Sequence, residues 1–86
     1  MTDMPLNFPD EPTRRQWLID NADYFTVIRR QNRKYEREEF HSLTGAEQAA
    51  NRMVERDPSL RLMIYAVYDV HDTYVKTIQA GKADAG

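Results

Sequence analysis

Two histidines and the carboxylates near them are the residues of this chain best suited to metal binding or catalysis. Asp69, His71 and Asp72 stand together where two expected strands reverse, and carboxylates with imidazole form a ligand set for divalent metals. A metal site needs three or four convergent ligands, and apart from His41 no second cluster accompanies this one. Because Asp and His are also common in turns, ordinary turn chemistry is the favoured interpretation.

His41 has Glu39 and Ser42 beside it in the sequence, which suggests an acid–base pair. Neighbours in a strand point to opposite faces, so His41 and Ser42 diverge, whereas Glu39 and His41 share a face. A pair without a pocket or a nucleophile is not a mechanism. We therefore predict a non-enzymatic protein with no catalytic residues, no metal site and no cofactor.

A basic run surrounds the first expected hairpin turn. Its members are Arg29, Arg30, Arg33, Lys34 and Arg37. Arginine forks suit phosphate oxygens, and a β-ribbon can enter a nucleic-acid groove. The competing interpretation is a solvated hairpin tip whose arginines pair with nearby glutamates or block edge-to-edge aggregation. Nucleic-acid binding through these five residues is the second functional hypothesis.

The last expected hairpin is rich in tyrosine and methionine, which are favoured at protein interfaces. Its first strand, over 60–69, is apolar on both faces, with Leu62 and Ile64 on one face and Met63 and Tyr65 on the other. One long helix covers one face, so the N-terminal helix or a second subunit must cover the other. The predicted interface residues are Trp17, Met63, Tyr65, Val67 and Tyr74.

Composition restricts the class of protein further. The chain has 86 residues, which is one domain's worth, and its formal net charge is −2, so the molecule as a whole is not a strongly basic nucleic-acid binder. The absence of cysteine excludes disulfides and thiolate chemistry. No stretch approaches the length of a membrane helix, and the N-terminus lacks the pattern of a signal peptide. We expect a cytoplasmic protein with no membrane partner.

The spacing of apolar residues along the chain predicts helices in some segments and strands in others. The expected elements are a short helix capped by Thr13, strands over 24–30 and 34–43, a helix capped by Thr44 and ended by Asp57-Pro58, a strand over 60–69, a turn over 70–72 and a strand over 73–78. The predicted fold is therefore α+β: a short N-terminal helix and then strand-strand-helix-strand-strand, with a four-stranded, mostly antiparallel sheet and one long helix packed on a face.

Proline and small polar residues mark the ends of the domain. We predict a flexible N-terminal arm over 1–12, on which Leu6 and Phe8 contact the body, a single domain over 13–79, and a disordered tail over 80–86. The segments YFTVIRR, KYEREEF, SLTGAEQAANRMVERDP and LMIYAVYD resemble small uncharacterised bacterial and phage proteins with a strand-strand-helix-strand-strand layout. The resemblance covers roughly residues 24–78, and it implies that layout and a phage origin but no functional residue.

The leading hypothesis is a small intracellular interaction or accessory protein that forms a homodimer through its sheet. An unidentified protein partner is the open alternative to a second copy, and nucleic acid is the runner-up.

Overall fold

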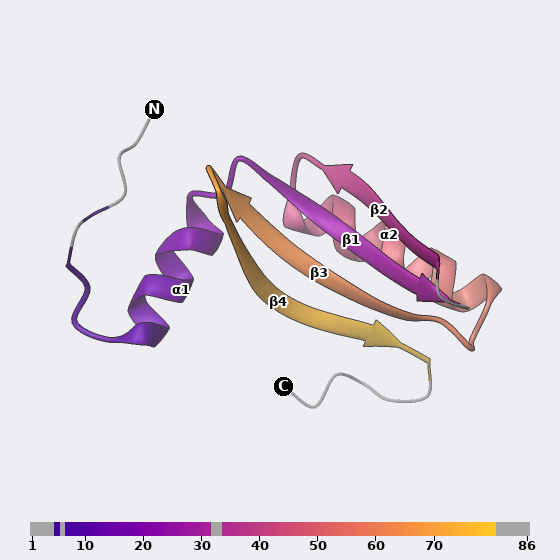
Figure 1. Ribbon diagram of the computed structural model, residues 1–86. Coiled ribbons are helices and arrows are strands. Elements are labelled where there is room, and N and C mark those ends of the chain that lie inside the picture. The colour runs from indigo at the N-terminus through magenta and orange to yellow at the C-terminus, as the bar shows by residue number, and fades with distance from the viewer. Residues whose placement is uncertain (1–4, 6, 32–33, 81–86) are drawn as a thin grey trace.

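The computed structural model describes residues 5, 7–31 and 34–80, and it confirms the predicted α+β architecture. The elements follow in the order α1 (Glu11–Asp20), β1 (Tyr24–Gln31), β2 (Lys34–Phe40), α2 (Leu43–Arg56), β3 (Arg61–Tyr68) and β4 (His71–Gln79). The four strands form one antiparallel sheet in the order β2-β1-β3-β4 (Figure 1). Both hairpins therefore pair their own strands, and β1 and β3 form the centre of the sheet.

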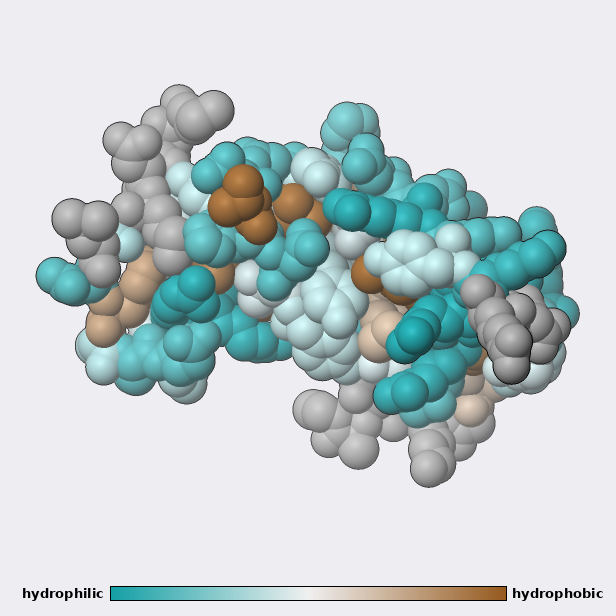
Figure 2. Space-filling model, in the orientation of Figure 1, coloured by the Kyte–Doolittle hydropathy of each residue, from teal (hydrophilic) through white to brown (hydrophobic). Residues whose placement is uncertain are grey.

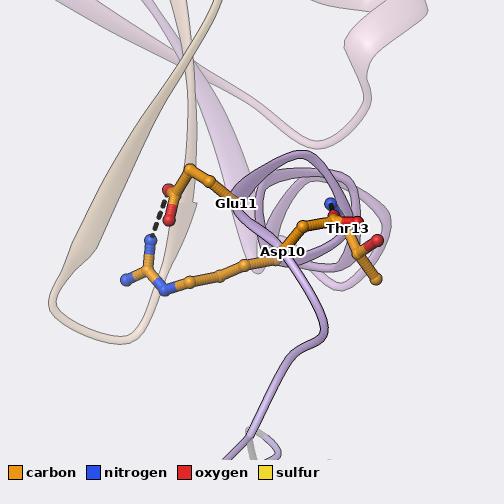
Figure 3. A network of polar contacts seen from close by, with 4 residues as sticks. Asp10, Glu11 and Thr13 are labelled. Carbon is orange, nitrogen blue, oxygen red and sulfur yellow. Dashed lines mark hydrogen bonds and ion pairs between the residues drawn. The ribbon is translucent and has the colours of Figure 1, made fainter.

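The first helix begins earlier than predicted, because Asp10 and not Thr13 is its N-cap. The Asp10 carboxylate accepts a 2.8 Å hydrogen bond from the backbone N–H of Thr13 (Figure 3). Pro12 occupies the first turn, where its missing N–H costs no helical hydrogen bond. An exposed ion pair of 3.2 Å between Arg14 and Glu11 also spans this turn. The predicted boundary between arm and domain at residue 13 therefore falls inside the first turn of α1.

The long helix also begins before the predicted cap. Ser42 is its N-cap and accepts a 3.0 Å hydrogen bond from the N–H of Gly45, whereas the predicted cap, Thr44, lies inside the first turn. The predicted end at Asp57 is confirmed, since α2 ends at Arg56. Asp57 then accepts hydrogen bonds from the N–H and the hydroxyl of Ser59, which turn the chain toward β3.

The strand boundaries differ from the prediction by one to three residues. The predicted strand over 34–43 ends at Phe40 because Ser42 already caps α2. The second hairpin turns at Asp69 and Val70, not over 70–72, so that Tyr68 pairs with His71. Asp69 has a φ of 53°, the left-handed conformation that the tight hairpin turns require at their first position. The ladder between β3 and β4 is also interrupted by a bulge, which leaves Val75 between the paired residues Tyr74 and Lys76.

The core lies between α2 and one face of the sheet. The apolar stripe of α2, Ala46, Ala50 and Val54, is buried against strand residues that alternate to the same face. Those strand residues are Phe25 and Val27 on β1 and Leu62, Ile64 and Ala66 on β3. The alanines expose no surface, so the helix backbone lies close to the sheet. An ion pair of 3.1 Å between Lys76 of β4 and Glu47 of α2 crosses the rim of this layer.

Helix α1 lies beside the end of the sheet that carries the turn between β3 and β4 (Figure 1). Its Ile19, and Ala22 just after the helix, pack against the same core that α2 covers, and Leu18 is buried. Trp17 meets the edge of Tyr68 with 5.0 Å between ring centroids, and Phe8 lies on its other side at 6.0 Å. The prediction that Phe8 contacts the body is therefore confirmed, whereas Leu6 lies outside the described residues.

The molecule is elongated, 41 Å long and 24 Å wide in both other directions. The predicted disordered tail falls, except for Ala80, outside the residues that the structure describes. Over the described ranges, no helix is long and apolar enough to cross a membrane.

Candidate interaction surface

The face of the sheet opposite α2, here termed the open face, carries no helix of the described chain. On the two central strands it is formed by Tyr24, Thr26, Ile28 and Arg30 of β1 and by Arg61, Met63, Tyr65 and Val67 of β3. Figure 1 shows α2 behind the sheet and α1 at its end, so that the front of the sheet is free of both helices. A hollow of about 320 Å³ lies on this face, and all its described lining residues belong to strands β1, β2, β3 and β4. No residue of α1 lines this hollow, and Ile19 of α1 packs against the core between α2 and the sheet. Leu18 of α1 and Val67 at the end of the open face are both buried but lie outside that core. The expectation that another subunit covers the face stays a prediction.

The strand register arranges the open face in rows across the sheet. From the end with the turn between β3 and β4, the rows are Tyr24-Val67-Asp72, then Glu39-Thr26-Tyr65-Tyr74, then Arg37-Ile28-Met63-Thr77, and last Tyr35-Arg30 with Arg61-Gln79. On the central strands, the two inner rows hold Ile28, Met63 and Tyr65, and the outer row at the β3–β4 turn adds Tyr24 and Val67. The two outer rows and the outer strands hold the charges.

The side chains in the middle of the open face pack on one another. Tyr65 and Tyr74 pair across strands with their rings edge to face, and the hydroxyls of Tyr74 and Thr77 share a hydrogen bond of 2.5 Å. Arg37 of β2 donates a hydrogen bond of 3.3 Å to the hydroxyl of Tyr24 on β1, and its guanidinium lies 6.0 Å from the centre of that ring. Thr26, which lies between these groups, is only 1% exposed.

The surface that remains accessible is mixed in character. Tyr35 and Tyr74 are 60% and 43% exposed, and Ile28, Met63 and Tyr65 are half-buried although no helix covers them. Figure 2 shows this face with pale and brown surface over the middle of the sheet and teal, hydrophilic surface at its margins. Tyrosine, methionine and arginine around an apolar centre are the composition of protein interfaces.

Four of the five predicted interface residues lie on the open face. Met63, Tyr65 and Val67 alternate to it from β3, and Tyr74 faces Tyr65 from β4. Val67 is buried at the margin of the face, with an exposed fraction of 3%. Trp17 lies elsewhere, between Phe8 and Tyr68. The structure therefore brings four of the predicted residues together and separates the tryptophan from them.

The predicted nucleic-acid residues are divided between the two faces of the sheet by strand alternation. Arg29 and Lys34 point to the side of α2, where Arg29 lies 3.9 Å from Glu36. Arg30 and Arg37 point to the open face. Arg33 lies outside the described residues. Neither face thus carries more than two of the described cations of the run, and Arg37 is engaged with Tyr24.

The candidate metal ligands and the candidate acid–base pair also lie apart. His71 and Asp72 are neighbours in β4 and alternate to opposite faces, while Asp69 forms the turn. Among the residues that the structure describes, no group of three or more histidines and carboxylates is placed to hold a metal ion. The hydroxyl of Ser42 is engaged in capping α2, so it is not directed at His41.

A second hollow, of about 380 Å³, lies between the outer strand β2 and α2. Val27 and Met53 form its apolar wall. Its charged lining consists of Arg29, Glu36, Arg37 and Glu38. Because both signs of charge alternate around this hollow, its lining does not select one class of charged ligand.

Sequence reasoning missed several residues of the open face, above all Thr26 and Ile28 of β1 and Arg61 of β3. The signal was present, because alternation in YFTVIRR separates Thr26 and Ile28 from Phe25 and Val27. Alternation alone does not show which of the two faces is exposed, because tertiary packing decides which side of the sheet α2 covers.

Comparison of the chain with protein-family models, with curated proteins and with solved structures gives no match.

Proposed function

We propose that this protein is a small, non-enzymatic interaction protein that associates with itself through the open face of its sheet. The observation that carries the proposal is a sheet with apolar side chains on both faces and the long helix α2 on only one of them. Ile28, Met63, Tyr65 and Tyr74 gather there around the hollow and its rim. Burial of this surface in a second copy removes apolar area from water, which is the main driving force of association.

The open face has about the size that a modest dimer needs. Strands roughly 4.8 Å apart with a rise of about 3.3 Å per residue give four strands of eight residues a footprint near 500 Å². Side-chain relief increases the accessible area above that footprint. Specific interfaces bury about 600–1,000 Å² per partner, so the whole face is required and association at micromolar concentration is expected.

The edges of the sheet are less suited to association than the face. Edge strand β2 exposes five charged side chains of both signs, and such charges oppose pairing with another strand. Edge strand β4 is bulged at Val75, and the Arg15 side chain donates hydrogen bonds of 3.0 Å to the carbonyl oxygens of Tyr74 and Val75. These features favour a face-to-face arrangement.

The arrangement of tyrosines and charges on the open face favours a protein partner over nucleic acid. Single-stranded nucleic acid is bound by flat, accessible aromatic rings within a positive groove. Here Tyr65 and Tyr74 are turned edge to face toward each other, and the cations of the basic run are divided between two surfaces. Asp72 and Glu39 further lower the positive potential of the open face.

Sedimentation velocity over a concentration series tests the proposal. The wild-type chain is expected to pass from monomer to dimer in the micromolar range. Met63→Asp, in the middle of the face, is expected to keep it monomeric, because a carboxylate there is desolvated in the dimer. Val70→Asp is the matched control, since Val70 is 83% exposed at the hairpin turn and not on the face. A wild-type chain that stays monomeric across the series contradicts the proposal.

A further inference from the structure

The charges of the open face are sorted along the strand direction. Arg30 and Arg61 lie toward the end of the sheet where β1 turns into β2. Arg37 lies on the same side of the middle, one row from it, and its guanidinium is directed back to the hydroxyl of Tyr24. Glu39 and Asp72 lie toward the opposite end, where β3 turns into β4. The row through Val27 and Ile64, whose side chains point to the other face, separates the two groups.

We propose that two copies pack open face to open face about a two-fold axis that runs across the strands, above the row of Val27 and Ile64. This inference rests on the proposed self-association and adds the orientation of the partner. The rotation lays each strand over the same strand of the second copy with its direction reversed. The basic end of one copy therefore meets the acidic end of the other.

The strand register fixes which side chains then meet. Residues equally distant from the axis row come together, so Arg37 lies opposite the partner's Glu39 and Met63 lies opposite the partner's Tyr65. Arg61 lies beside the partner's Asp72. Packed sheets are rotated by about 30° relative to each other, an offset that the long arginine side chains can span.

The other simple two-fold axis, parallel to the strands, brings like charges together. It keeps each end of the sheet over the same end of the partner, so Arg30 meets the partner's Arg61. The apolar middle of the face is covered in either arrangement, so its burial does not choose between them. Opposite charges across an interface fix the orientation, whereas like charges oppose it. The charge pattern therefore selects the axis across the strands.

Charge reversal at one pair of positions tests the orientation. In Arg37→Glu each new carboxylate faces the partner's Glu39, and in Glu39→Arg each new guanidinium faces the partner's Arg37. Each variant alone is expected to dimerise roughly tenfold or more weakly than the wild type. When the two variants are mixed, both contacts become attractive, so the mixed dimer is expected to form preferentially. The double variant Arg37→Glu/Glu39→Arg is expected to recover dimerisation.

Sedimentation of the separate and mixed variants, with a fluorescent label on one of them, measures these outcomes. Circular dichroism and urea unfolding check that each variant folds, since Arg37→Glu loses the contact with Tyr24. Glu38→Arg is the matched control, because Glu38 lies between these positions and points to the other face; it is expected to dimerise as the wild type does. A wild-type dimer whose reversed variants show no preference for each other refutes the orientation and leaves self-association standing, whereas a monomeric wild type refutes both.

Discussion

Tyr65 and Tyr74 face each other across β3 and β4, with ring centroids 5.7 Å apart and ring planes at 74°. This edge-to-face pair lies on the open face immediately beside the bulge in the ladder. It gives the surface a rigid aromatic centre without a helix above it. Such pairs contribute roughly 0.5–1.5 kcal/mol beyond the burial of their area.

Loss of the Tyr74 ring is expected to destabilise the monomer by about 1 kcal/mol. The measurement is urea unfolding of Tyr74→Ala in the Met63→Asp background, where dimerisation does not contribute to stability. Tyr74→Phe is the control, because it keeps the ring and removes only the hydrogen bond with Thr77. Equal losses in the two variants are the result that contradicts a role for the ring pair.

Self-association predicts that thermal stability depends on protein concentration. A dimer that forms only from folded chains raises the unfolding midpoint as concentration increases. We expect this rise in the wild type and in Val70→Asp, and no rise in Met63→Asp. Calorimetry at several concentrations measures it, and an unchanged wild-type midpoint is evidence against association of the folded chain.

The turn at Asp69 is expected to accept glycine and reject branched side chains. The left-handed conformation costs an ordinary L-residue roughly 1–2 kcal/mol, which glycine avoids. The N–H of residue 69, which donates to the Asp23 carboxylate at 3.0 Å, is retained in any such substitution. Asp69→Val is therefore expected to unfold at lower urea than Asp69→Gly, by about 1–2 kcal/mol in free energy. Equal stabilities of the two variants contradict the assigned turn geometry.

Arg15 is expected to protect the bulged edge of β4. Its guanidinium donates to two β4 carbonyl groups, so Arg15→Ala should destabilise the fold by about 1 kcal/mol and speed amide exchange near Val75. Arg14→Ala is the control, since Arg14 forms an exposed ion pair with Glu11 within the same helix, and it should change stability by less than about 0.5 kcal/mol. Hydrogen exchange followed by mass spectrometry separates the two variants.

Two exposed carboxylates, Asp10 and Asp57, are expected to contribute to the loss of folding stability at acid pH. Hydrogen bonds from Thr13 lower the pKa of Asp10 from its ordinary value of 3.8, and hydrogen bonds from Ser59 lower the pKa of Asp57 in the same way. A folded-state pKa below the unfolded value contributes stability above pH 3.8 and loses it as pH falls through the folded-state pKa. The free energy of unfolding should therefore fall less steeply with acid in Asp10→Asn/Asp57→Asn than in the wild type. If the free energy of unfolding falls equally steeply with acid in the two proteins, these two carboxylates do not contribute as expected.

The order of helices and strands was predictable because local signals agreed with the fold. Aromatic and β-branched residues marked β1 and β3, and the residue before Pro58 ended α2. The helix starts were placed too late because several residues able to cap stand close together. The N-caps are Asp10 and Ser42, not Thr13 and Thr44. For α1 the sequence contains a further indication of the earlier start, because proline is favoured in the first turn of a helix and Pro12 stands there.

Strand alternation, a local property, determined by itself which side chains share a face, and so it already grouped Met63, Tyr65 and Val67 apart from Leu62 and Ile64. Only the tertiary structure decided which of those faces is covered. The alanine stripe of α2 fits one face closely, and Ile19 of α1 packs against that same core. The sorting of charge along the open face likewise depends on the pairing of β1 with β3, which belong to different hairpins. This pairing depends on residues far apart in the sequence, because the register of the strands is set by which of their side chains are buried against α2.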